Sequence, residues 1–526
     1  MAAETLAPSL DVACERWADR PAITFGDETI TYSRLGERLR ALAAAYHRLG
    51  IGPGDRVLCQ LPDRPEHVMA MHAAWANGAI HVGGDHDLTA QELSWLVGWT
   101  GAAALLFQPR ADGPDPLAPV RAVREAHPET RLLLQGATVD GGGVHALGEL
   151  LEPAGALPTR APPLLGPDDT GLLLLTSGTT GKPKGVMETL PHCWAKMQFF
   201  ADAFRPGPDD VHLLYLPMAH VFGLRLSLLA LLSGGRLVLL DRFSPEAALR
   251  LVGEEGVTVL PGMPTHFRLL LDRLDRARHD VGSLRWAVSA ATSMPRPLAE
   301  AIYSELGAEI LYVYGCSEGF TTETIDRDDI LCGSVGSTVF RGPPGAPPDG
   351  RVAVMDPETG DLLAPGQVGE IVFGAAHPVR YWRAPEVATD GWYHTGDLGR
   401  VDEDGRVFVL GRLKELVNRA GLKVAPSEVE AAIVRHAGVA DAAVIATPDP
   451  VLSEATCACV VPTDGEPPGL ADLRAFLAPT LARHKLPDEL CVVQRIPRTR
   501  VGKVDRAALA KQVLDGDLPR ERLRPR

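Results

Sequence analysis

The sequence predicts an α/β protein. Its large N-terminal domain holds two βαβ-type sheets and a small β-barrel-like unit, and a small α+β domain follows. Short apolar runs such as Arg56 to Leu61 alternate with longer Ala-, Leu-, Arg- and Glu-rich segments, which is typical of βαβ units with parallel strands. From about Gly350 the apolar runs are separated by turn signals, which indicates antiparallel strands. After Gly411 an α+β pattern returns, so a second domain is expected there.

The main domain boundary is predicted near Gly411 to Glu415. We expect an N-terminal domain over residues 1–410 and a C-terminal domain over residues 415–526. The segment from Ser427 to His436 predicts a helix that Ser427 caps, with acidic residues in the first turn, where the helix dipole favours them. A Pro-rich stretch over residues 152–167 is a second linker candidate, inside the first domain.

Composition narrows the function classes. The chain has 526 residues, of which 45% are hydrophobic and 23% charged, as in soluble globular proteins of more than one domain. Its formal net charge of −15 argues against non-specific nucleic-acid binding, so no nucleic-acid partner is expected. The eight cysteines are scattered without a C-x-x-C pair, which argues against a zinc site or a disulfide framework.

The chain shows no targeting or membrane signal. Its first residues lack a basic segment followed by an apolar one, so no signal peptide is expected. The longest apolar stretch, from Leu224 to Leu240, is interrupted by Arg225, Gly234, Gly235 and Arg236 and is too short for a membrane span. The sequence therefore predicts a cytoplasmic protein without a membrane span.

One short stretch combines hydroxyl residues, glycines and lysines. Residues 175–187 read LTSGTTGKPKGVM and directly follow an apolar run that predicts a buried strand. Glycines allow close approach of the backbone to a ligand, while the hydroxyls, exposed N–H groups and lysines favour anionic oxygens, so the stretch predicts a phosphate cradle. It is not a Walker A loop, because Pro183 follows Lys182 where that motif needs Ser or Thr. A solvent-exposed polar loop is the alternative.

Five segments, in this order, support a more specific interpretation: TSGTTGKPKG at 176–185, YGCSE at 314–318, GWYHTGDL at 391–398, the block from Gly411 to Glu430, and PRTRVGK at 497–503. Together they resemble the signature motifs of the adenylate-forming superfamily, which includes acyl- and aryl-CoA synthetases, nonribosomal adenylation domains and luciferases. The upstream segment from Tyr32 to Leu93 also follows the family's pattern, so the resemblance covers nearly the whole chain. Its texture is closest to the aryl-acid adenylating enzymes.

The resemblance implies a reaction and a set of roles. A carboxylate would attack the α-phosphorus of ATP, giving an acyl-adenylate and pyrophosphate, and catalysis would depend on positioning and charge neutralisation. It implies that Lys503 reaches the carboxylate and the α-phosphate, that Glu318 holds Mg²⁺, and that His220 is a gate beside the carboxylate. Contacts with the nucleotide are implied for Thr176, Ser177, Gly178, Thr179, Thr180 and Lys184 at the β- and γ-phosphates, Ser317 at the α-phosphate, Tyr314 at the adenine, and Asp397 and Arg412 at the ribose.

Each role has an alternative that the residues leave open. A polar side chain in a turn, or an aromatic ring in a core, also occurs where it has no catalytic or binding role. The alternatives are a core aromatic for Tyr314, a turn aspartate for Asp397, a surface glutamate for Glu318, a solvated lysine for Lys503, and a core histidine for His220.

A second half-reaction is also implied. In this family the C-terminal domain is mobile and rotates about a hinge, here residues 411–414, where Lys414 matches the hinge position. The rotation would remove Lys503 and present the stretch from Arg419 to Gly421 to a thiol. The acceptor would be CoA, or the phosphopantetheine of a separate carrier protein, because the chain shows no carrier-protein serine motif. A homodimer is a family-level expectation.

The acid is predicted from departures within the family. Aryl-acid enzymes that read a 2-hydroxyl carry Asn after the His of P-M-A-H-N, whereas this chain has Val221. No aspartate stands where an α-amino group would be paired, so α-amino acids are not favoured. We therefore predict an aryl or short unsaturated, apolar carboxylate, held by a pocket of Val221, Phe222, Met263, Ala290, Cys316 and Val335.

Other functions stay open at this point. The same fold could activate an acid for a non-thiol acceptor, by forming an amide or by activating nitrite to diazotise an arylamine. A non-catalytic nucleotide-binding paralogue is disfavoured, because all the residues with implied catalytic roles are present. The segment from Gly83 to Asp87 departs from the family's pattern, and the sequence offers no account of it.

Overall fold

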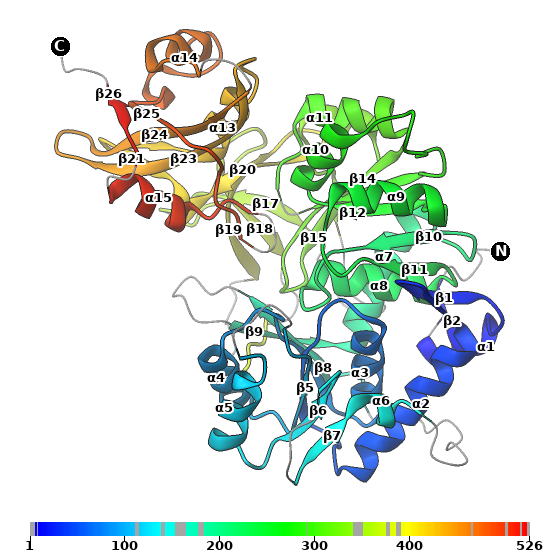
Figure 1. Cartoon of the computed structure of the whole chain (residues 1–526). Helices are drawn as coiled ribbons and strands as arrows, with labels where there is room; N and C mark the ends of the chain where they lie inside the picture. The colour runs from blue at the N-terminus through cyan, green and yellow to red at the C-terminus, as the bar shows by residue number, and fades with distance from the viewer. Residues whose placement is uncertain are drawn as a thin grey trace.

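The computed structural model of the chain contains four β-sheets with helices packed around them (Figure 1). Two large sheets form the N-terminal domain, a small antiparallel sheet follows, and the fourth sheet forms the C-terminal domain. The structure describes residues 6–7, 9–110, 115–137, 142–152, 165–176, 184–290, 292–339, 351–374, 379–384, 391–463, 467–499, 503–515 and 518–522.

The first sheet has nine strands, six of which run parallel. Antiparallel strands close both edges. Its central strands are short and mostly apolar, and in each only the first residue is not buried, as expected for strands covered on both faces. In order across the sheet the strands are β16 (Thr338–Val339), β15 (Thr321–Thr324), β14 (Glu309–Gly315), β13 (Trp286–Ser289), β12 (Val259–Gly262), β10 (Val211–Leu214), β11 (Arg236–Leu239), β1 (Pro21–Phe25) and β2 (Glu28–Thr31).

The second sheet has seven strands, again with six in parallel. Its antiparallel edge is a hairpin whose connecting residues, 177–183, lie outside the described residues. In order the strands are β7 (Val144–Ala146), β6 (Arg131–Leu134), β5 (Ala104–Phe107), β3 (Arg56–Gln60), β4 (Ile80–Gly83), β8 (Thr170–Thr176) and β9 (Lys184–Thr189). The predicted pair of βαβ-type sheets is therefore confirmed.

Helix ends follow local sequence signals. The segment after Ser244 begins with Pro245 and ends before Gly256, which has a positive φ of 64°, so a serine cap, a first-turn proline and a left-handed glycine define one helix. The N-terminal domain contains α1 (Leu10–Arg16), α2 (Tyr32–Arg48), α3 (Pro65–Ala76), α4 (Ala90–Thr100), α5 (Ala118–Ala126), α6 (Leu147–Leu150), α7 (Leu190–Phe204), α8 (Val221–Leu232), α9 (Pro245–Glu255), α10 (Pro264–Arg273), α11 (Arg296–Ala301), the π-helical turn η1 (Ile302–Leu306) and α12 (Arg327–Cys332).

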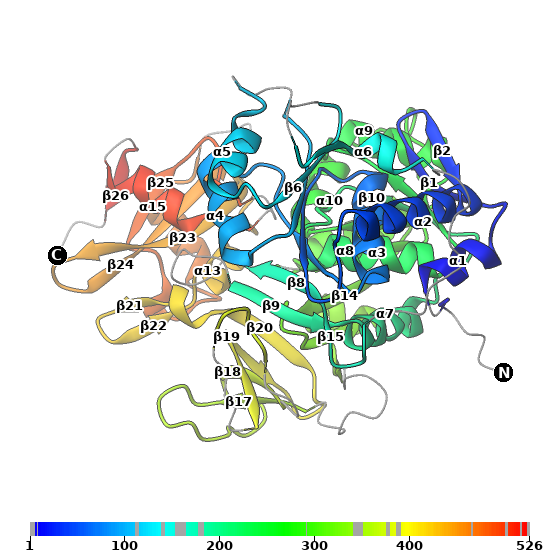
Figure 2. The same cartoon turned by 90° about the horizontal axis from the view of Figure 1, so that it is seen from below.

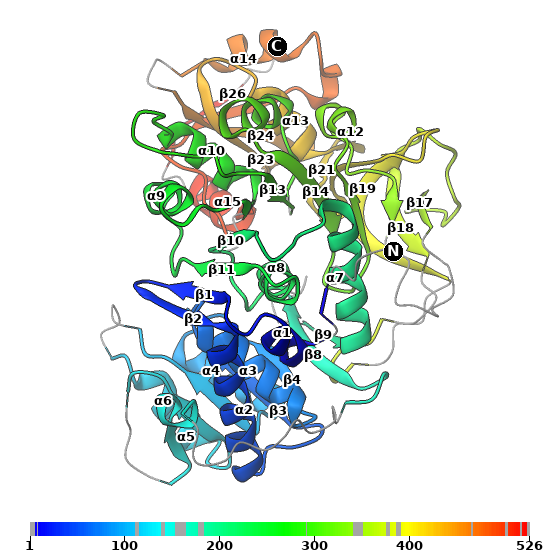
Figure 3. The same ribbon diagram turned by 90° about the vertical axis from the view of Figure 1, so that its right-hand side faces the viewer.

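Helices α3 and α8 form the centre of the large domain. Helix α3 packs on β3 and β4, whereas α8 packs on β10 and β11, and nearly every residue of both helices is buried. Figure 3 shows α8 between the two large sheets. A helix that is apolar on all sides is stable only when it is covered on all sides, so these two helices hold the sheets together.

The antiparallel unit predicted after Gly350 is a four-stranded sheet that stands beside the two large ones (Figure 2). The C-terminal domain has its own sheet and two buried apolar clusters. The antiparallel unit has β17 (Val352–Met355), β18 (Gly369–Gly374), β19 (Trp392–Val401) and β20 (Val407–Arg412). The C-terminal domain has η2 (Leu413–Glu415), β21 (Val417–Arg419), β22 (Leu422–Val424), α13 (Pro426–Ile433), β23 (Val439–Asp449), β24 (Ser453–Pro462), α14 (Leu470–Leu477), η3 (Arg483–Lys485), β25 (Glu489–Val492), α15 (Arg506–Leu514) and β26 (Arg520–Arg522).

The predicted hinge lies between two anchored residues. Arg412, the last residue of β20, is paired with Asp397 of β19. Glu415, at the end of η2, accepts a hydrogen bond at 3.0 Å from Arg506 of α15. Leu413 and Lys414 connect these anchors, so a rotation over residues 411–414 stays a prediction to which the geometry gives support.

Within the described residues, none of the helices is both long enough and apolar enough to cross a membrane. The eight cysteines are free thiols, and all but Cys316 and Cys332 are buried. The free thiols agree with the expectation from the sequence that the cysteines form no disulfide framework.

Glu323 in β15 is a buried carboxyl group that is 4% exposed. Burial raises its pKa from 4.5 to about 9, and the Asp202 carboxylate acts in the same direction. Because the pKa in the folded state lies above that in the unfolded state, its contribution to stability is complete below about pH 4.5 and is lost as the pH rises towards 9.

We expect Glu323→Gln to be more stable than the unchanged chain above this lower pH, because glutamine stays neutral. The difference in the free energy of unfolding should grow by up to about 1.4 kcal/mol per pH unit until the pH nears the raised pKa. Urea unfolding followed by circular dichroism at several pH values measures this. The exposed Glu358 provides the control variant Glu358→Gln, and a pH-independent difference for Glu323→Gln would contradict the expectation.

Candidate active site

Several candidate residues lie at the carboxyl ends of the parallel strands of the nine-stranded sheet. Parallel strands end at the same edge, and ligands of α/β proteins bind beyond these carboxyl ends. Met263 directly follows β12, Ala290 follows β13, and Cys316 follows β14. The segment after β10 leads to His220, the residue that precedes α8. Four consecutive strands of one parallel group thus bring four candidates to the same edge, although the sequence separates them widely.

Asp397 lies at the centre of a three-residue unit. Tyr314 of β14 donates a hydrogen bond from its hydroxyl to Asp397 Oδ2 at 2.7 Å. Arg412 Nε is 2.7 Å from Asp397 Oδ1, because β19 and β20 place the two residues opposite each other. An aromatic ring, a carboxylate and a guanidinium from three separated segments therefore meet at one point.

The turn before Asp397 is held by a network within the antiparallel unit. Thr395 Oγ1 accepts the Asp397 N–H at 3.0 Å and donates to the Ile371 carbonyl at 2.7 Å. Glu370 accepts the Gly396 N–H at 2.9 Å. Gly396 has a φ of 71°, a conformation that favours glycine. Burial raises the pKa of the Asp397 carboxyl above its usual range, although the neighbouring Arg412 guanidinium acts in the opposite direction.

Lys503 of the C-terminal domain is directed to the same place. Its charge acts on the Asp397 carboxyl, and the charges of Arg412 and Asp397 act on Lys503. Desolvation lowers the pKa of the Lys503 ammonium, although the residue retains contact with solvent, and Arg412 acts in the same direction. The Thr499 N–H donates a backbone hydrogen bond of 2.7 Å to the Lys503 carbonyl.

Glu318 and Lys184 both lie beside the Tyr381 side chain. The Tyr381 hydroxyl donates to Glu318 Oε1 at 2.8 Å, and Lys184 Nζ lies 5.4 Å from the centre of the Tyr381 ring. Thr176 is the register partner of Lys184, and the two form the last pair of the hairpin β8–β9 before its connecting residues. The predicted phosphate loop is therefore described only at its two ends, Thr176 and Lys184. Four of its predicted residues, Ser177, Gly178, Thr179 and Thr180, lie outside the described residues.

Ser317 and Cys316 lie in a tight turn between β14 and β15. The Cys316 N–H donates to the Phe320 carbonyl at 3.0 Å, and the Gly319 N–H donates to the Cys316 carbonyl at 3.2 Å. Gly319 has a φ of 113°, and a Cβ there would lie 2.6 Å from His192 Nε2, so only glycine fits. Burial raises the pKa of the Cys316 thiol to about 12, which makes it a poor nucleophile.

Asp63 and Gly83 contact the backbone just before His220, the predicted gate. Asp63, which is buried, accepts the Met218 N–H at 2.7 Å, two residues before His220. Gly83 packs directly on Ala219, since a Cβ there would lie 2.9 Å from the Ala219 Cα and carbonyl oxygen. Gly83, the first residue of the atypical segment from Gly83 to Asp87, therefore packs against the backbone next to His220.

Four of the predicted pocket residues lie in two different surroundings. Val221 and Phe222 form the start of α8 and pack, with Ala290, against the main apolar core. Val335 instead joins β15 to β20, because its N–H donates to the Val407 carbonyl at 2.8 Å and its carbonyl accepts from Thr322 at 2.9 Å. It is 3% exposed, so it is a buried connection between two strands.

Several residues at the site were not predicted from the sequence. Tyr381 bonds Glu318, and Tyr393 stacks on Phe320 with ring centres 4.6 Å apart. The Tyr312 hydroxyl accepts the Met294 N–H at 3.0 Å and donates to the Thr292 carbonyl at 3.1 Å, which orders the segment after Ala290. Aromatic residues within the motif segments were the available signal, but their partners lie far away in the sequence.

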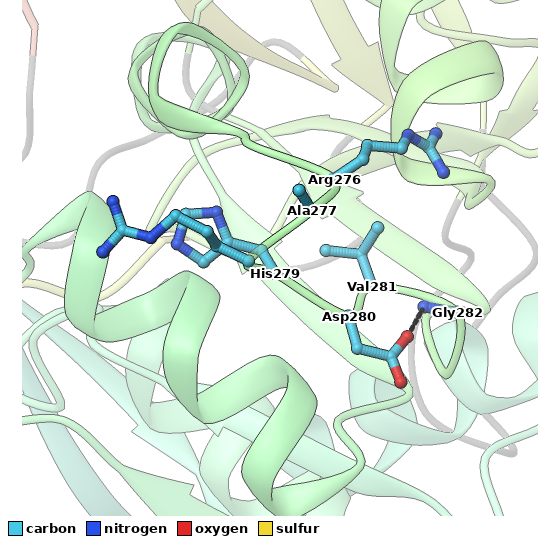
Figure 4. Close-up of a pocket in the computed structure, with 7 residues that line it drawn as sticks. Arg276, Ala277, His279, Asp280, Val281 and Gly282 are labelled. Carbon is cyan, nitrogen blue, oxygen red and sulfur yellow. Dashed lines mark hydrogen bonds between the residues drawn. The ribbon is translucent and has the colours of Figure 1, made fainter.

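The described residues contain no group of three or more His, Cys, Asp or Glu side chains that could hold a metal ion by themselves. A hollow lined by the loop over residues 276–282 is seen in Figure 4, where Asp280 accepts the Gly282 N–H at 2.9 Å. This loop precedes β13, whereas Ala290 follows it, so the hollow lies at the opposite edge of the sheet from the candidate residues.

The sequence of the chain matches two protein-family models and known proteins. Residues 10–380 match the family model of the AMP-binding enzymes, and residues 428–503 match that of the AMP-binding enzyme C-terminal domain. The chain is 33% identical to a salicylyl-CoA synthase / salicylate adenylyltransferase of a Streptomyces species, over 94% of this chain and 91% of that protein.

Two solved structures match the fold over nearly the whole chain. The ATP-bound MatB of Rhodopseudomonas palustris matches with a TM-score of 0.82 and 28% identity, over 96% of this chain and 99% of that chain. The amide bond synthetase McbA of Marinactinospora thermotolerans matches with a TM-score of 0.81 and 28% identity, over 96% of this chain and 100% of that chain.

The contact between Asp63 and the gate leads to a prediction about acid-dependent exchange of pyrophosphate into ATP. Asp63→Ala should lower kcat/KM for the acid by about 10- to 100-fold, because the backbone before His220 loses its buried acceptor. Asp63→Asn keeps an oxygen acceptor and should stay within about 3-fold of the unchanged chain.

Burial raises the pKa of Asp63 to about 7, so its charge changes near neutral pH. Asp63→Asn removes this charge but keeps an oxygen acceptor, whereas Asp63→Ala removes both. If the hydrogen bond alone matters, Asp63→Asn keeps its activity from about pH 6 to about pH 8. Equal losses in Asp63→Ala and Asp63→Asn would contradict the proposed positioning.

Proposed function

Because this chain belongs to the family of AMP-binding enzymes, we propose that it activates a carboxylic acid as an acyl-adenylate and then transfers the acyl group to a thiol. The observation that carries this proposal is the convergence of Tyr314, Asp397 and Arg412 from the large domain with Lys503 from the small one. Such a set offers a ring for a base, acceptors for ribose hydroxyls and a mobile cation for charge that develops during the reaction.

The nucleotide would bind across the edge of the sheet. The ionised Asp397 accepts hydrogen bonds only, which suits two ribose hydroxyls, and Arg412 holds that carboxylate in place. The loop that begins at Thr176 and ends at Lys184 would hold the β- and γ-phosphates, which leave as pyrophosphate. Ser317, in the turn after β14, would contact the α-phosphate. Lys503 would neutralise the attacking carboxylate and the α-phosphate together.

The residues present fit Mg²⁺. This ion keeps waters and binds through one or two carboxylates together with substrate phosphates, so a single carboxylate near the phosphate loop is sufficient. Glu318 supplies that carboxylate, oriented by Tyr381 and close to Lys184. When bound, Mg²⁺ would neutralise charge on the departing pyrophosphate.

The thiol half-reaction is supported by the hinge geometry. Arg412 and Glu415 are bonded to different domains, so a rotation at Lys414 would swing Lys503 away from the acid. Arg419 forms two hydrogen bonds to Asp488, at 2.8 and 2.9 Å, and Ala420 has a positive φ of 51°, so the expected pantetheine face is a well-defined turn. CoA and the phosphopantetheine of a separate carrier protein are the two candidate acceptors.

The acid is proposed to be an aryl or short unsaturated carboxylate. Val221 and Phe222 at the start of α8, together with Ala290 and Met263, present apolar surface next to His220. The Streptomyces relative is named for salicylate, but Val221 offers no hydrogen bond to a 2-hydroxyl. An acid without that group is therefore favoured.

A non-thiol acceptor is the second candidate. A structure of comparable similarity is an amide bond synthetase, and the adenylation half of the chemistry is common to both outcomes. Offering CoA, carrier proteins and amines to the same adenylate, with mass-spectrometric detection of products, distinguishes them. A homodimer and a cytoplasmic location stay predictions from the sequence.

Lys503→Ala tests the adenylation role. Exchange of labelled pyrophosphate into ATP should fall by about 100- to 1,000-fold, because the variant lacks the cation at the developing charge. Transfer from a supplied acyl-adenylate to the thiol should persist, since Lys503 is expected to leave the site for that step.

Lys511 of α15 is an exposed lysine eight residues further along the chain, so Lys511→Ala is a matched control that should retain both activities. Pyrophosphate exchange that survives Lys503→Ala would rule out this role. Exchange that no carboxylic acid supports, in the unchanged chain with ATP and Mg²⁺, would rule out the proposed function itself.

A further inference from the structure

The side chain of Tyr381 contacts two groups that have different roles in the proposed function. Its hydroxyl donates a hydrogen bond of 2.8 Å to Glu318 Oε1, and Lys184 Nζ lies 5.4 Å from the centre of its ring. Glu318 is the carboxylate proposed for Mg²⁺, whereas Lys184 ends the loop proposed for the β- and γ-phosphates. A tyrosine outside the motif segments therefore connects the two.

The backbone of Tyr381 is attached to the phosphate hairpin. Residues 380–382 lie along β9, to which two backbone hydrogen bonds of 2.8 and 3.0 Å join them, and Tyr381 pairs with Val186 in antiparallel. Diagonal neighbours across such a pair lie within reach of an aromatic side chain. Lys184, two residues before Val186, is such a neighbour, which explains why the ring of Tyr381 lies beside it.

The residue after Tyr381 holds the segment from its other side. The Trp382 indole N–H donates to the Trp99 carbonyl at 3.2 Å, and the Arg56 guanidinium lies over the Trp382 ring, 5.4 Å from its centre. The position of Tyr381 is therefore set by β9 and by α4, independently of Glu318.

Glu318 has less support of its own. It lies half-buried in the turn between β14 and β15, at the end of a long side chain. The Tyr381 hydroxyl bonds its carboxylate, and the Tyr393 hydroxyl also faces it. A carboxylate has about four acceptor positions, so these hydroxyls leave others for a metal ion. Because Mg²⁺ demands near-ideal octahedral geometry, a fixed carboxylate orientation favours its binding.

We propose that Tyr381 is a positioning residue that couples the metal carboxylate to the phosphate loop. Its hydroxyl orients Glu318 toward the nucleotide-bound Mg²⁺, and its ring holds Lys184 toward the phosphates. The inference rests on the proposed adenylation function and adds that separable parts of one side chain support the metal contact and the phosphate contact. Tyr381 acts through these two residues and not on the reacting atoms.

The test measures ATP binding to the full chain by isothermal titration calorimetry, once with Mg²⁺ and once with EDTA. The ratio of the Kd in EDTA to the Kd in Mg²⁺ isolates the contribution of the metal and requires no turnover. In Tyr381→Phe this ratio should be about 10- to 100-fold smaller than in the unchanged chain, because loss of a group that orients a metal ligand typically costs this factor in metal affinity. The Kd in EDTA should stay within about 3-fold, because phenylalanine keeps a ring beside Lys184.

Tyr381→Leu removes the hydroxyl and the ring together. It should show the same loss of the Mg²⁺ effect and should also bind ATP about 2- to 5-fold more weakly in EDTA, as expected when an exposed cation–π contact is lost. The thermal unfolding midpoint reports whether each variant is folded. If Tyr381→Phe does not fold, Tyr381→Leu carries the same expectation for the metal.

Tyr303→Phe is the matched control. The Tyr303 ring lies against Arg327, which pairs with Glu309, the first residue of β14. Glu318 follows the other end of that strand, so Tyr303→Phe should change neither Kd.

A double-mutant cycle checks that the hydroxyl acts through the proposed metal ligand. In Glu318→Ala, the further change Tyr381→Phe should alter the ratio of the two Kd values by less than about 3-fold, because the group that the hydroxyl orients is absent.

Three results would overturn the proposal. The first is an unchanged Mg²⁺ effect in Tyr381→Phe. The second is a loss of ATP affinity in Tyr381→Phe that is equal with Mg²⁺ and with EDTA, because a purely structural tyrosine would act on both alike. The third is the same loss of the Mg²⁺ effect when Tyr381→Phe is added to Glu318→Ala. Failure of the adenylation function is a separate outcome, recognised by Mg²⁺-dependent ATP binding without pyrophosphate exchange with any carboxylic acid in the unchanged chain.

Discussion

The carboxylate of Asp397 is the interaction on which the arrangement of the site depends. It joins Tyr314 from the nine-stranded sheet to Arg412 at the end of the antiparallel unit, and so connects two separately built parts of the chain next to the domain boundary. The Asp397 side chain is largely buried whereas that of Arg412 is half-exposed, so loss of Arg412 would leave a desolvated carboxylate without its cation. The same carboxylate is therefore a structural connection and, in the proposed function, also the group that binds the ribose.

Positive charge is concentrated where the chain as a whole is negative. The formal net charge is −15, yet Arg412 and Lys503 both act on the Asp397 carboxylate, and Lys184 lies beside Tyr381, which bonds Glu318. Lys196 and Arg225 are buried on α7 and α8. Long-range attraction cannot account for the binding of an anionic nucleotide to such a chain. Selection depends instead on short contacts in a partly desolvated site, where one well-placed cation is worth far more than in water.

Much of the fold was predictable because its signals are local. The alternation of apolar runs with helical segments predicted two parallel sheets, and turn signals after Gly350 predicted the antiparallel unit. The motif segments also located Tyr314, Asp397 and Lys503. The support of the gate was not predictable, since the contacts of Asp63 with Met218 and of Gly83 with Ala219 join residues more than 130 positions apart in the chain.

The sequence by itself determined the class of fold, the order of the motifs and the residue types available for chemistry, because backbone periodicity and turn preferences act over a few residues. Only the tertiary structure decided which side chains meet. Packing of α7 and α8 buried Lys196 next to Arg225, and strand order brought Tyr381 to Glu318. Such contacts depend on how whole elements stack, and the energy of a buried charge depends on that environment rather than on its neighbours in the sequence.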